Sequence, residues 1–289
     1  MSTAQTQPGV VDRIKRSLVG LKMPMALEIV DATLRRIERG EVSALEAIDL
    51  LLAEELTLRE TRRVKTALVM ARLSTVKTLA GFDFSFQPTL DRSRVLALAE
   101  LKFIERSEVL HFLGPPGTGK SHLAVALGVE AVRAGYSVYF STLADLVGAL
   151  AKAEREGSLR QKIKFFCRFA LLIVDEIGYL PVISGGGNLF FQLVNARYER
   201  GAMILTSNRG FAEWGDVFND TVVATALLDR LLHHAVVVQI EGSSYRLRQH
   251  NDLVPDHIRA RALAQPSAVP PARRRGRPAK DRSADPLPG

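Results

Sequence analysis

One segment sets the architecture of this chain: Phe112-Leu113-Gly114-Pro115-Pro116-Gly117-Thr118-Gly119-Lys120-Ser121. It reads as the end of a hydrophobic strand, a loop of the pattern G-x-x-x-x-G-K-[ST], and the start of a helix expected from His122 to Ala134. Polyphosphate oxygens bind best where backbone N–H groups converge at the positive end of a helix. The segment therefore predicts a phosphate-binding loop.

The residue types in this loop match the chemistry of a nucleotide. Gly117 and Gly119 let the backbone approach the phosphates, Lys120 reaches the β- and γ-phosphates, and the Ser121 hydroxyl ligates Mg²⁺. An ordinary glycine-rich turn is the alternative, but the strand before it and the helix after it both favour the phosphate loop. The predicted ATP-binding set is Gly114, Pro115, Pro116, Gly117, Thr118, Gly119, Lys120, Ser121 and His122.

A second strand ends in two carboxylates. Residues 170–174 are Ala-Leu-Leu-Ile-Val, which is typical of a strand buried on both faces of a parallel sheet, and Asp175 and Glu176 follow. Carboxyl ends of such strands are where open α/β sheets bind ligands. We expect Asp175 to hold Mg²⁺ and Glu176 to polarise the attacking water, and Asn208 at the end of another buried strand to position water or γ-phosphate. A plain strand end is the alternative for the two acids.

Composition and charge limit the function classes. The 289 residues are 47% hydrophobic and 24% charged, which is typical of a globular protein with a sizeable core. No apolar run approaches the length of a membrane helix and no leader pattern begins the chain, so we expect a cytoplasmic protein. The single cysteine, Cys167, excludes an intrachain disulfide. The net charge of +8 divides as +3 over residues 1–80, 0 over 81–254 and +5 over 255–289, which is compatible with basic ends that meet a polyanion.

The first 80 residues predict a small helical domain. Apolar residues recur at helical spacing in two stripes, and Ser43 with Glu46 predicts a capping box. The stripes are Met25, Ile29, Thr33 and Ile37, then Leu45, Ile48, Leu52 and Leu56.

A further helix is expected from about Arg59 to Lys77, with its bases opposite Val64, Ala67, Leu68 and Ala71. The segment contains six basic residues and only one acidic residue, Glu60. The helix therefore presents either a solvated surface or a contact for DNA phosphates. The predicted DNA contacts are Arg59, Arg62, Arg63, Lys65 and Arg72.

Two other features stay open between readings. Phe82, Phe84 and Phe86 either line an adenine pocket or pack on the sheet, and packing is favoured for any one of them. The pair His233 and His234 suggests a metal, but the sequence offers no further ligand at a matching spacing, so we interpret the pair as structural.

The motif series resembles the IstB-like helper ATPases encoded by insertion sequences, which belong to the AAA+ ATPases and are related to the DnaC helicase loaders. The resemblance covers about residues 20–250. Beside the phosphate loop it is carried by Leu172-Ile-Val-Asp-Glu-Ile-Gly-Tyr-Leu-Pro181, Phe190-Phe-Gln-Leu-Val-Asn-Ala-Arg-Tyr-Glu-Arg-Gly201, Thr206-Ser-Asn208 with Trp214-Gly215, Leu227-Leu-Asp-Arg-Leu-Leu-His-His234 and Gly242-Ser-Ser-Tyr-Arg246.

The resemblance implies roles by position. Residues 114–121 are then Walker A, Asp175 and Glu176 are Walker B, and Asn208 is sensor 1. Arg230 matches an arginine finger that acts on the nucleotide of a neighbouring subunit in a homo-oligomer. Arg246 falls in the Ser-Tyr-Arg motif, which implies a sensor-2-like role in nucleotide binding. The implied function is ATP-dependent assembly on duplex DNA, which is remodelled and delivered to a transposase. A replicative helicase loader is the runner-up, and a binding module that keeps nucleotide as a structural ligand is the third reading.

The last segment differs in composition. From Pro255 the chain is rich in Pro, Ala and Arg, and we expect it to be disordered. Residues 273–280 read Arg-Arg-Arg-Gly-Arg-Pro-Ala-Lys, which is similar to an AT-hook whose Arg275 and Arg277 follow a narrow minor groove; a solubilising tail is the alternative. The expected organisation is a helical DNA-binding and assembly domain over residues 1–80, an α/β AAA+ P-loop domain with a parallel sheet over 81–254, and a disordered basic tail over 255–289.

Overall fold

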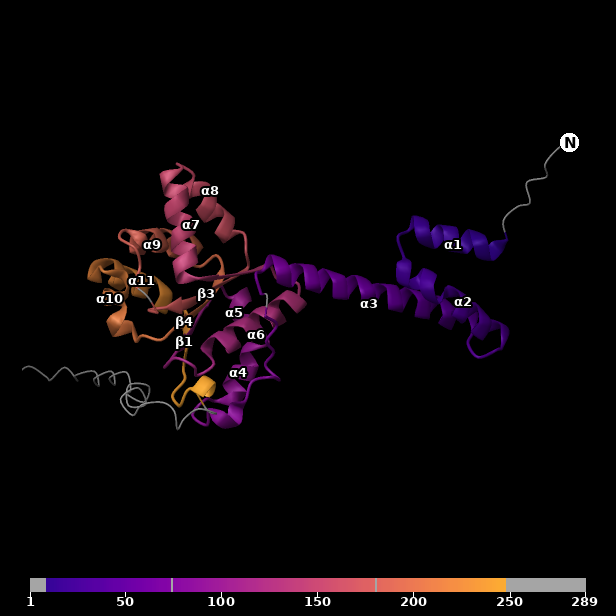
Figure 1. The fold of residues 1–289 in the computed structure, drawn as a ribbon, viewed down its shortest axis with the longest axis horizontal. Coiled ribbons are helices and arrows are strands. Elements are labelled where there is room, and N and C mark those ends of the chain that lie inside the picture. The colour runs from indigo at the N-terminus through magenta and orange to yellow at the C-terminus, as the bar shows by residue number, and fades with distance from the viewer. Residues whose placement is uncertain (1–8, 74, 180, 248–289) are drawn as a thin grey trace, which may run out of the picture.

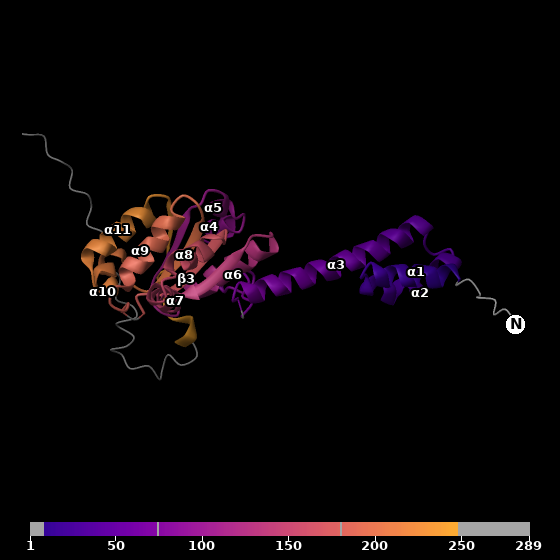
Figure 2. The same cartoon turned by 90° about the horizontal axis from the view of Figure 1, so that it is seen from above.

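The computed structural model describes residues 9–73, 75–179 and 181–247. Figures 1 and 2 show a helical lobe and a sheet-centred lobe, joined by the long helix α3 (Ala44–Met70). The helical lobe also contains α1 (Val10–Gly20) and α2 (Pro24–Glu38). The predicted domain boundaries at residues 80 and 254 stay predictions, and the expected tail lies outside the described residues.

The sheet is parallel throughout, as predicted. Its order is β2-β3-β4-β1-β5, and neighbouring strands are all parallel. Leu113 pairs with Ser207 on one side and with Gln239 on the other, while Thr142 pairs with Asp175. The carboxyl ends of the strands therefore meet at one edge. The strands are β1 (Val109–Leu113), β2 (Val138–Thr142), β3 (Leu171–Ile177), β4 (Ala202–Ser207) and β5 (Ala235–Gln239).

Helices cover both faces of this sheet, because alternate side chains of its strands are apolar on both sides. Leu171 and Ile173 point into a core built around α6, and Leu172 and Val174 point into a second core around α7, α9 and α11. The helices of this lobe are α4 (Arg92–Leu98), α5 (Lys102–Glu105), α6 (Lys120–Arg133), α7 (Leu143–Arg155), α8 (Leu159–Cys167), α9 (Gly186–Arg197), α10 (Trp214–Phe218) and α11 (Thr221–Leu232), with short 3-10 turns at Phe84–Phe86, Phe211–Glu213 and Tyr245–Leu247. Among the described residues, no helix is both long and apolar enough to traverse a bilayer.

The expected helix from Arg59 to Lys77 is wrong in its bounds. Its first part is the second half of α3, which runs without a break for 27 residues from Ala44 and ends at Met70. Arg72 follows the helix in the left-handed conformation, with φ of 62°. The predicted packing side is confirmed: Ala71 is buried in the core around α6, and Val64, Ala67 and Leu68 pack against that core.

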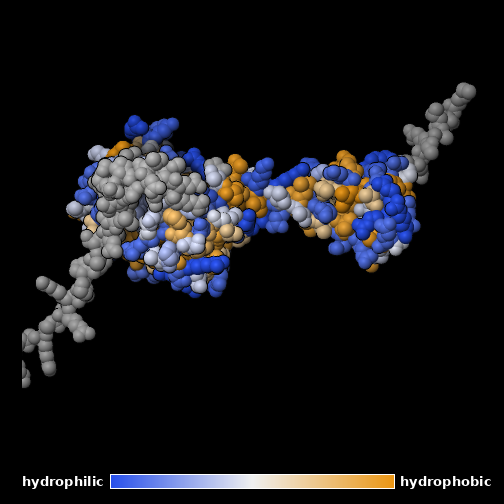
Figure 3. Space-filling model, turned by 60° about the horizontal axis from the view of Figure 1, so that its bottom comes forward, coloured by the Kyte–Doolittle hydropathy of each residue, from blue (hydrophilic) through white to orange (hydrophobic). Residues whose placement is uncertain are grey.

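The stripe predicted for the first half of α3 is also wrong. Leu45, Ile48, Leu52 and Leu56 are 80%, 55%, 48% and 66% exposed. The buried residues of this half are Ala47 and Glu55, and Leu51 packs against the core of α1 and α2. Each lies one position earlier than a predicted residue, which rotates the buried face by about 100°. On α2 the buried residues are Ala26, Val30 and Thr33. Apolar surface is visible on the helical lobe in Figure 3.

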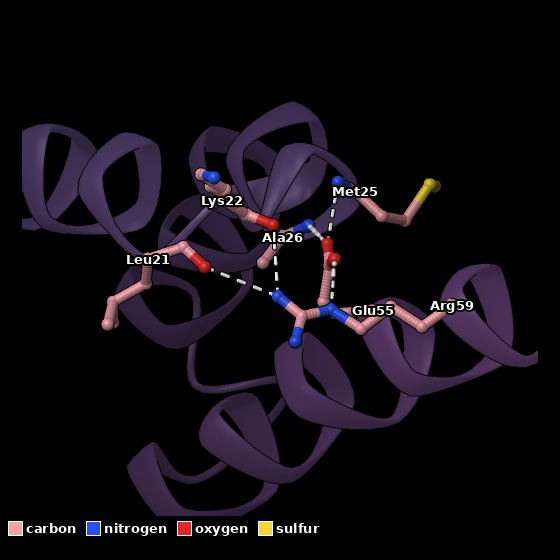
Figure 4. A network of polar contacts seen from close by, with 6 residues as sticks. All are labelled: Leu21, Lys22, Met25, Ala26, Glu55 and Arg59. Carbon is pink, nitrogen blue, oxygen red and sulfur yellow. Dashed lines mark hydrogen bonds and ion pairs between the residues drawn. The ribbon is translucent and has the colours of Figure 1, made fainter.

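A buried carboxylate explains this rotation. The Glu55 side chain accepts hydrogen bonds from the backbone N–H groups of Met25 (2.9 Å) and Ala26 (3.4 Å), at the start of α2 (Figure 4). No side chain caps that end of α2 from within its own chain segment, so Glu55 caps it from another helix. Arg59 donates from Nε to Glu55 Oε1 at 3.0 Å and from Nη2 to the carbonyls of Leu21 and Lys22.

The pKa of Glu55 records the balance of these contacts. Burial raises it, but the hydrogen bond from Arg59 and those from the backbone of Met25 and Ala26 outweigh burial, so the pKa lies below its ordinary value. The capping box at the start of α3 is confirmed: Ser43 N–H donates to Glu46 Oε2 (2.7 Å) and Glu46 N–H donates to Ser43 Oγ (3.2 Å).

Candidate nucleotide-binding site

The phosphate loop lies between β1 and α6, as predicted. Gly117 and Gly119 adopt φ values of 82° and 99°, which glycine reaches without a steric cost, and Lys120 begins the helix. The N-terminal N–H groups of a 14-residue helix therefore face the loop. A Cβ on Gly117 would also lie 2.0 Å from Ser244 Oγ, so this position needs glycine for close packing as well.

Residues 240–246 lie across the loop and were not predicted to do so. Ile240 N–H donates to the Leu113 carbonyl (2.8 Å), and Tyr245 N–H donates to the Gly117 carbonyl (3.0 Å). Two side chains from the segment before α4 hold the crossing in place: Gln87 donates to the Ser243 carbonyl and Thr89 to the Glu241 carbonyl. The segment brings Arg246 to the nucleotide pocket.

The pocket beside the loop has a volume of about 270 Å³ and joins the predicted loop to residues that sequence reasoning missed. Phe82 packs against the core around α6, which confirms the packing interpretation for that ring. Phe82 also lines the pocket, and its contact with adenine stays a prediction. The residues that were not predicted to line it are Lys77, Gly81, Asp83, Gln87 and Tyr245. The aromatic cluster before Pro88 signalled those near Phe82, and the motif that ends at Arg246 signalled Tyr245. The full lining is Lys77, Gly81, Phe82, Asp83, Gln87, Gly117, Thr118, Gly119, Lys120, Ser121, His122, Tyr245 and Arg246.

The Lys120 ammonium is buried in this pocket and donates to the Pro115 carbonyl at 2.7 Å. Its pKa is lowered to about 8, chiefly by burial; the charge of Asp175 opposes this lowering, and the charge of Arg246 adds to it. A polyanion at the loop would supply the negative charge that this ammonium lacks.

Asp175 is 6% exposed and is bound by two hydroxyls. Ser121 Oγ donates to Asp175 Oδ1 at 2.8 Å, and Thr206 Oγ1 donates to the same oxygen. A hydroxyl and a carboxylate that already touch form a hard-oxygen donor set, which is the kind that Mg²⁺ prefers. The residues predicted for Mg²⁺ therefore fit that ion, and the structure adds Thr206 beside them.

Glu176 stands in an unusual backbone conformation. Its φ is 65°, and the pairing of β3 with β4 shifts between Val174 and Ile177, so it occupies a bulge next to Asp175. Its N–H donates to Thr206 Oγ1 at 3.1 Å and its side chain is exposed. Left-handed conformations of residues other than glycine cluster at functional sites. One threonine thus fixes both acids of the strand end.

Asn208 lies next to the same bulge. Its amide nitrogen donates to the carbonyls of Ile177 (3.0 Å) and Gly178 (3.1 Å) in the amide orientation that satisfies both. The structure thus gives Asn208 a contact with the loop that follows Glu176. Its role toward water or phosphate stays a prediction.

Arg230 lies apart from the residues that line the pocket. It is on α11, and its guanidinium carbon is 4.8 Å from the centre of the Tyr198 ring. Both residues line a second, very small pocket with Glu199 and His234. The structure therefore groups Lys120, Ser121, Asp175, Glu176 and Arg246 around one site, and it places Arg230 in a different cluster.

The residues predicted to contact DNA have different surroundings. Arg59 is bound within the helical lobe, whereas Arg62, Arg63 and Lys65 are exposed on α3. The guanidinium of Arg72 is 5.2 Å from the centre of the Tyr139 ring. Arg275 and Arg277, with the AT-hook-like segment, lie outside the described residues. All of these DNA contacts remain predictions.

A P-loop after β1, two acids after β3 and a polar end to β4, all at the carboxyl edge of one parallel sheet, define a P-loop nucleotide-binding protein. The family described as IstB-like ATP binding protein matches residues 17–252 of this chain. The chain belongs to that family, as its motifs indicated.

Two curated relatives are insertion-sequence ATP-binding proteins. That of IS21 from Pseudomonas aeruginosa is 48% identical over 229 residues, which cover 79% of this chain and 86% of the relative. That of IS5376 from Geobacillus stearothermophilus is 41% identical over 238 residues, which cover 82% of this chain and 95% of the relative.

Solved structures whose backbone matches part of this chain include AMPPCP-bound DnaA from Aquifex aeolicus, with a TM-score of 0.49 and 23% identity. The match covers 65% of this chain and 59% of that one, less than two thirds of its length. A DnaC helicase loader matches with a TM-score of 0.41 and 23% identity, over 52% of this chain and 90% of that one.

Proposed function

We propose that this protein hydrolyses ATP and uses the nucleotide to control its assembly on duplex DNA, which it remodels and delivers to a transposase. The observation that carries the ATPase part is the arrangement at Asp175: two hydroxyls hold this buried carboxylate, and one of them comes from the phosphate loop. Relatives that are 41% and 48% identical are insertion-sequence proteins, which favours this reading over a helicase loader.

Each residue of the site has a defined part in this proposal. Lys120 and the start of α6 bind the phosphates, Ser121 and Asp175 hold Mg²⁺, and Arg246 contacts the nucleotide from the crossing segment. Mg²⁺, when bound, supplies Lewis-acid stabilisation of the phosphate charge. Glu176 orients and polarises water from its bulge, and Asn208 steadies the loop that follows it.

Arg230 supports the assembly part. Because it does not line the pocket that contains Lys120, we infer that it completes the site of a neighbouring subunit. A guanidinium that enters from another chain adds transition-state stabilisation only after assembly, so hydrolysis reports oligomerisation. The exposed bases Arg62, Arg63 and Lys65 support contact with the phosphates of DNA.

Subunit mixing tests this proposal directly. Lys120→Ala removes the nucleotide site but keeps the finger, and Arg230→Ala keeps the nucleotide site but removes the finger. We expect each variant alone to lose roughly 100-fold or more of the ATPase rate on duplex DNA, as expected for loss of a finger. Mixed subunits should regain a substantial fraction of it, because a site from one variant then meets a finger from the other.

The control is a mixture of Lys120→Ala with the double variant, which offers no complete site and should stay inactive. DNA retention of the same mixtures, measured by electrophoretic shift with ATP or ADP, reports assembly independently of turnover. Failure of the mixture to recover activity, although labelled subunits associate, would contradict the role of Arg230 in trans. Equal duplex binding by wild type and Lys120→Ala with and without ATP would contradict the coupling.

A further inference from the structure

The sequence offers no third metal ligand near His233 and His234, but the fold brings Glu199 close to them. Glu199 lies in the turn after α9, while His233 and His234 lie between the end of α11 and the start of β5. One ligand atom from each of the three side chains lies within 4.8 Å of the others, and all three residues are exposed. Glu199 is 34 positions before His233, so no local spacing in the sequence could reveal the trio.

We propose that Glu199, His233 and His234 form a binding site for a zinc-class divalent cation. Two imidazoles and one carboxylate are a donor set that Zn²⁺ takes, with the fourth position of its tetrahedron left to water. Metal–ligand bonds of about 2.0–2.2 Å place neighbouring ligand atoms about 3.3 Å apart. His234 Nε2 already lies 3.5 Å from Glu199 Oε1, so two of the three ligands stand close to this separation.

The choice of ion follows from the same donors. Mg²⁺ and Ca²⁺ prefer oxygen ligands, and only one of the three groups supplies oxygen. Nitrogen from histidine with a carboxylate suits zinc and its neighbours in the transition series. The ion of this site is thus different in kind from the Mg²⁺ expected at Ser121 and Asp175.

The local structure holds the ligands in place. Arg197, immediately before the turn, is buried and donates to the carbonyls of Phe166, Phe169 and Ala202, which anchors the end of α9. Glu199 adopts a φ of 57°, an uncommon conformation for a residue with a side chain. Tyr198 OH and His233 Nδ1 are 2.5 Å apart, and a hydrogen-bonded neighbour of this kind often orients a histidine ligand.

The position of the site suggests its consequence. An ion bound there joins the turn after α9 to the start of β5, and Tyr198 of the same turn carries the guanidinium of Arg230 on its ring. The ion therefore restrains the turn whose Tyr198 ring contacts Arg230. Because the ion binds the folded chain and not the unfolded one, it stabilises the fold by RT ln(1 + c/Kd), where c is the free ion concentration, and the melting temperature rises with c.

The test uses the full chain without a histidine tag and free of metal. Zinc binding is measured by calorimetry, and Co²⁺ replaces zinc as an absorption probe for tetrahedral nitrogen ligands. We expect the wild type to bind zinc and to melt at a higher temperature with it. Glu199→Gln and His234→Gln should each weaken binding by about tenfold or more and remove the melting shift.

Matched controls separate this site from other ligands. Glu156→Gln changes an exposed carboxylate in the turn just after α7, and His122→Gln changes a histidine that lines the nucleotide pocket; both should bind zinc like the wild type. Asp175→Asn should also keep zinc binding, so the result does not depend on the ATPase proposal. Circular dichroism checks that each variant folds, and Glu199→Gln decides the matter if a histidine variant does not. Unchanged zinc affinity in Glu199→Gln, or loss of binding in Asp175→Asn, would overturn the proposal.

Discussion

The two lobes each contain a buried carboxylate, and the two are held differently. In the helical lobe Glu55 is bound by a guanidinium and two backbone N–H groups. In the sheet-centred lobe Asp175 is bound by the hydroxyls of Ser121 and Thr206, which are neutral. A charged partner and a helix start satisfy Glu55 within the fold, whereas the neutral hydroxyls that bind Asp175 leave its charge to act on the Lys120 ammonium and on a bound cation. The same side-chain chemistry is thus structural in one lobe and ready for a ligand in the other.

The largest effect is expected when the charge of Asp175 is removed. Asp175→Asn keeps the shape of the side chain and its contacts with two hydroxyls but deletes the charge that attracts Mg²⁺. We expect the ATPase rate to fall by roughly 100-fold or more, since metal stabilisation of phosphate charge is worth several kcal/mol. Phosphate release under saturating ATP and Mg²⁺ measures this loss.

Glu60→Gln is the matched control, because it removes an exposed carboxylate from the helical lobe, where Glu60 lies 3.7 Å from Arg63. Its ATPase rate should equal that of the wild type. If Asp175→Asn hydrolyses ATP as fast as this control, the proposed division between the two carboxylates is wrong.

The second effect concerns the charge that faces Asp175. With a pKa of about 8, the Lys120 ammonium of the free protein loses its proton as the pH rises above that value, whereas bound phosphates hold the proton on. ATP affinity should therefore be constant below about pH 8 and fall by up to about tenfold per pH unit above it. Calorimetric titration from roughly pH 7 to roughly pH 10 measures this slope.

Lys120→Arg is the control for that titration, since a guanidinium stays charged throughout the range. Its affinity is expected to be lower than that of the wild type below about pH 8 and independent of pH across the range. A wild-type affinity that does not change across the range would show that the burial of Lys120 has no thermodynamic consequence for binding.

The sheet-centred lobe was predictable from the sequence because its chemistry is local. The phosphate loop, the buried strand before Asp175 and the polar end of β4 can each be recognised from a few consecutive residues. A parallel sheet then brings the ends of these strands together. Thr206 was visible at that strand end, but its contacts with Asp175 and Glu176 depend on the pairing of β3 with β4. Arg246 depends on the chain crossing the loop, which no periodicity encodes.

The helical lobe was predicted less well because its decisive contact is long-range. Periodicity located the helices correctly but predicted Ile48 and Leu52 on the buried face of α3. Leucine and isoleucine are buried far more often than glutamate, so the pattern did not indicate Glu55. Glu55 is buried since the uncapped start of α2, 30 residues earlier, supplies two N–H donors. The trio of Glu199, His233 and His234 was missed for the same reason.

The smallest effect is expected when the charge of the other buried carboxylate, Glu55 in the helical lobe, is removed. Glu55→Gln keeps the volume of the side chain but replaces the charged acceptor of Met25 and Ala26 by a neutral one, and it weakens the contact with Arg59. We expect several-fold faster hydrogen exchange at the first amides of α2, while the ATPase rate stays at the wild-type value. Because the folded pKa of Glu55 is lowered, its contribution is present above its ordinary pKa and is lost as the pH falls through the lowered one. The difference in exchange between wild type and variant should accordingly disappear in acid; a difference that persists there would mean that shape, and not charge, holds α3 against α2.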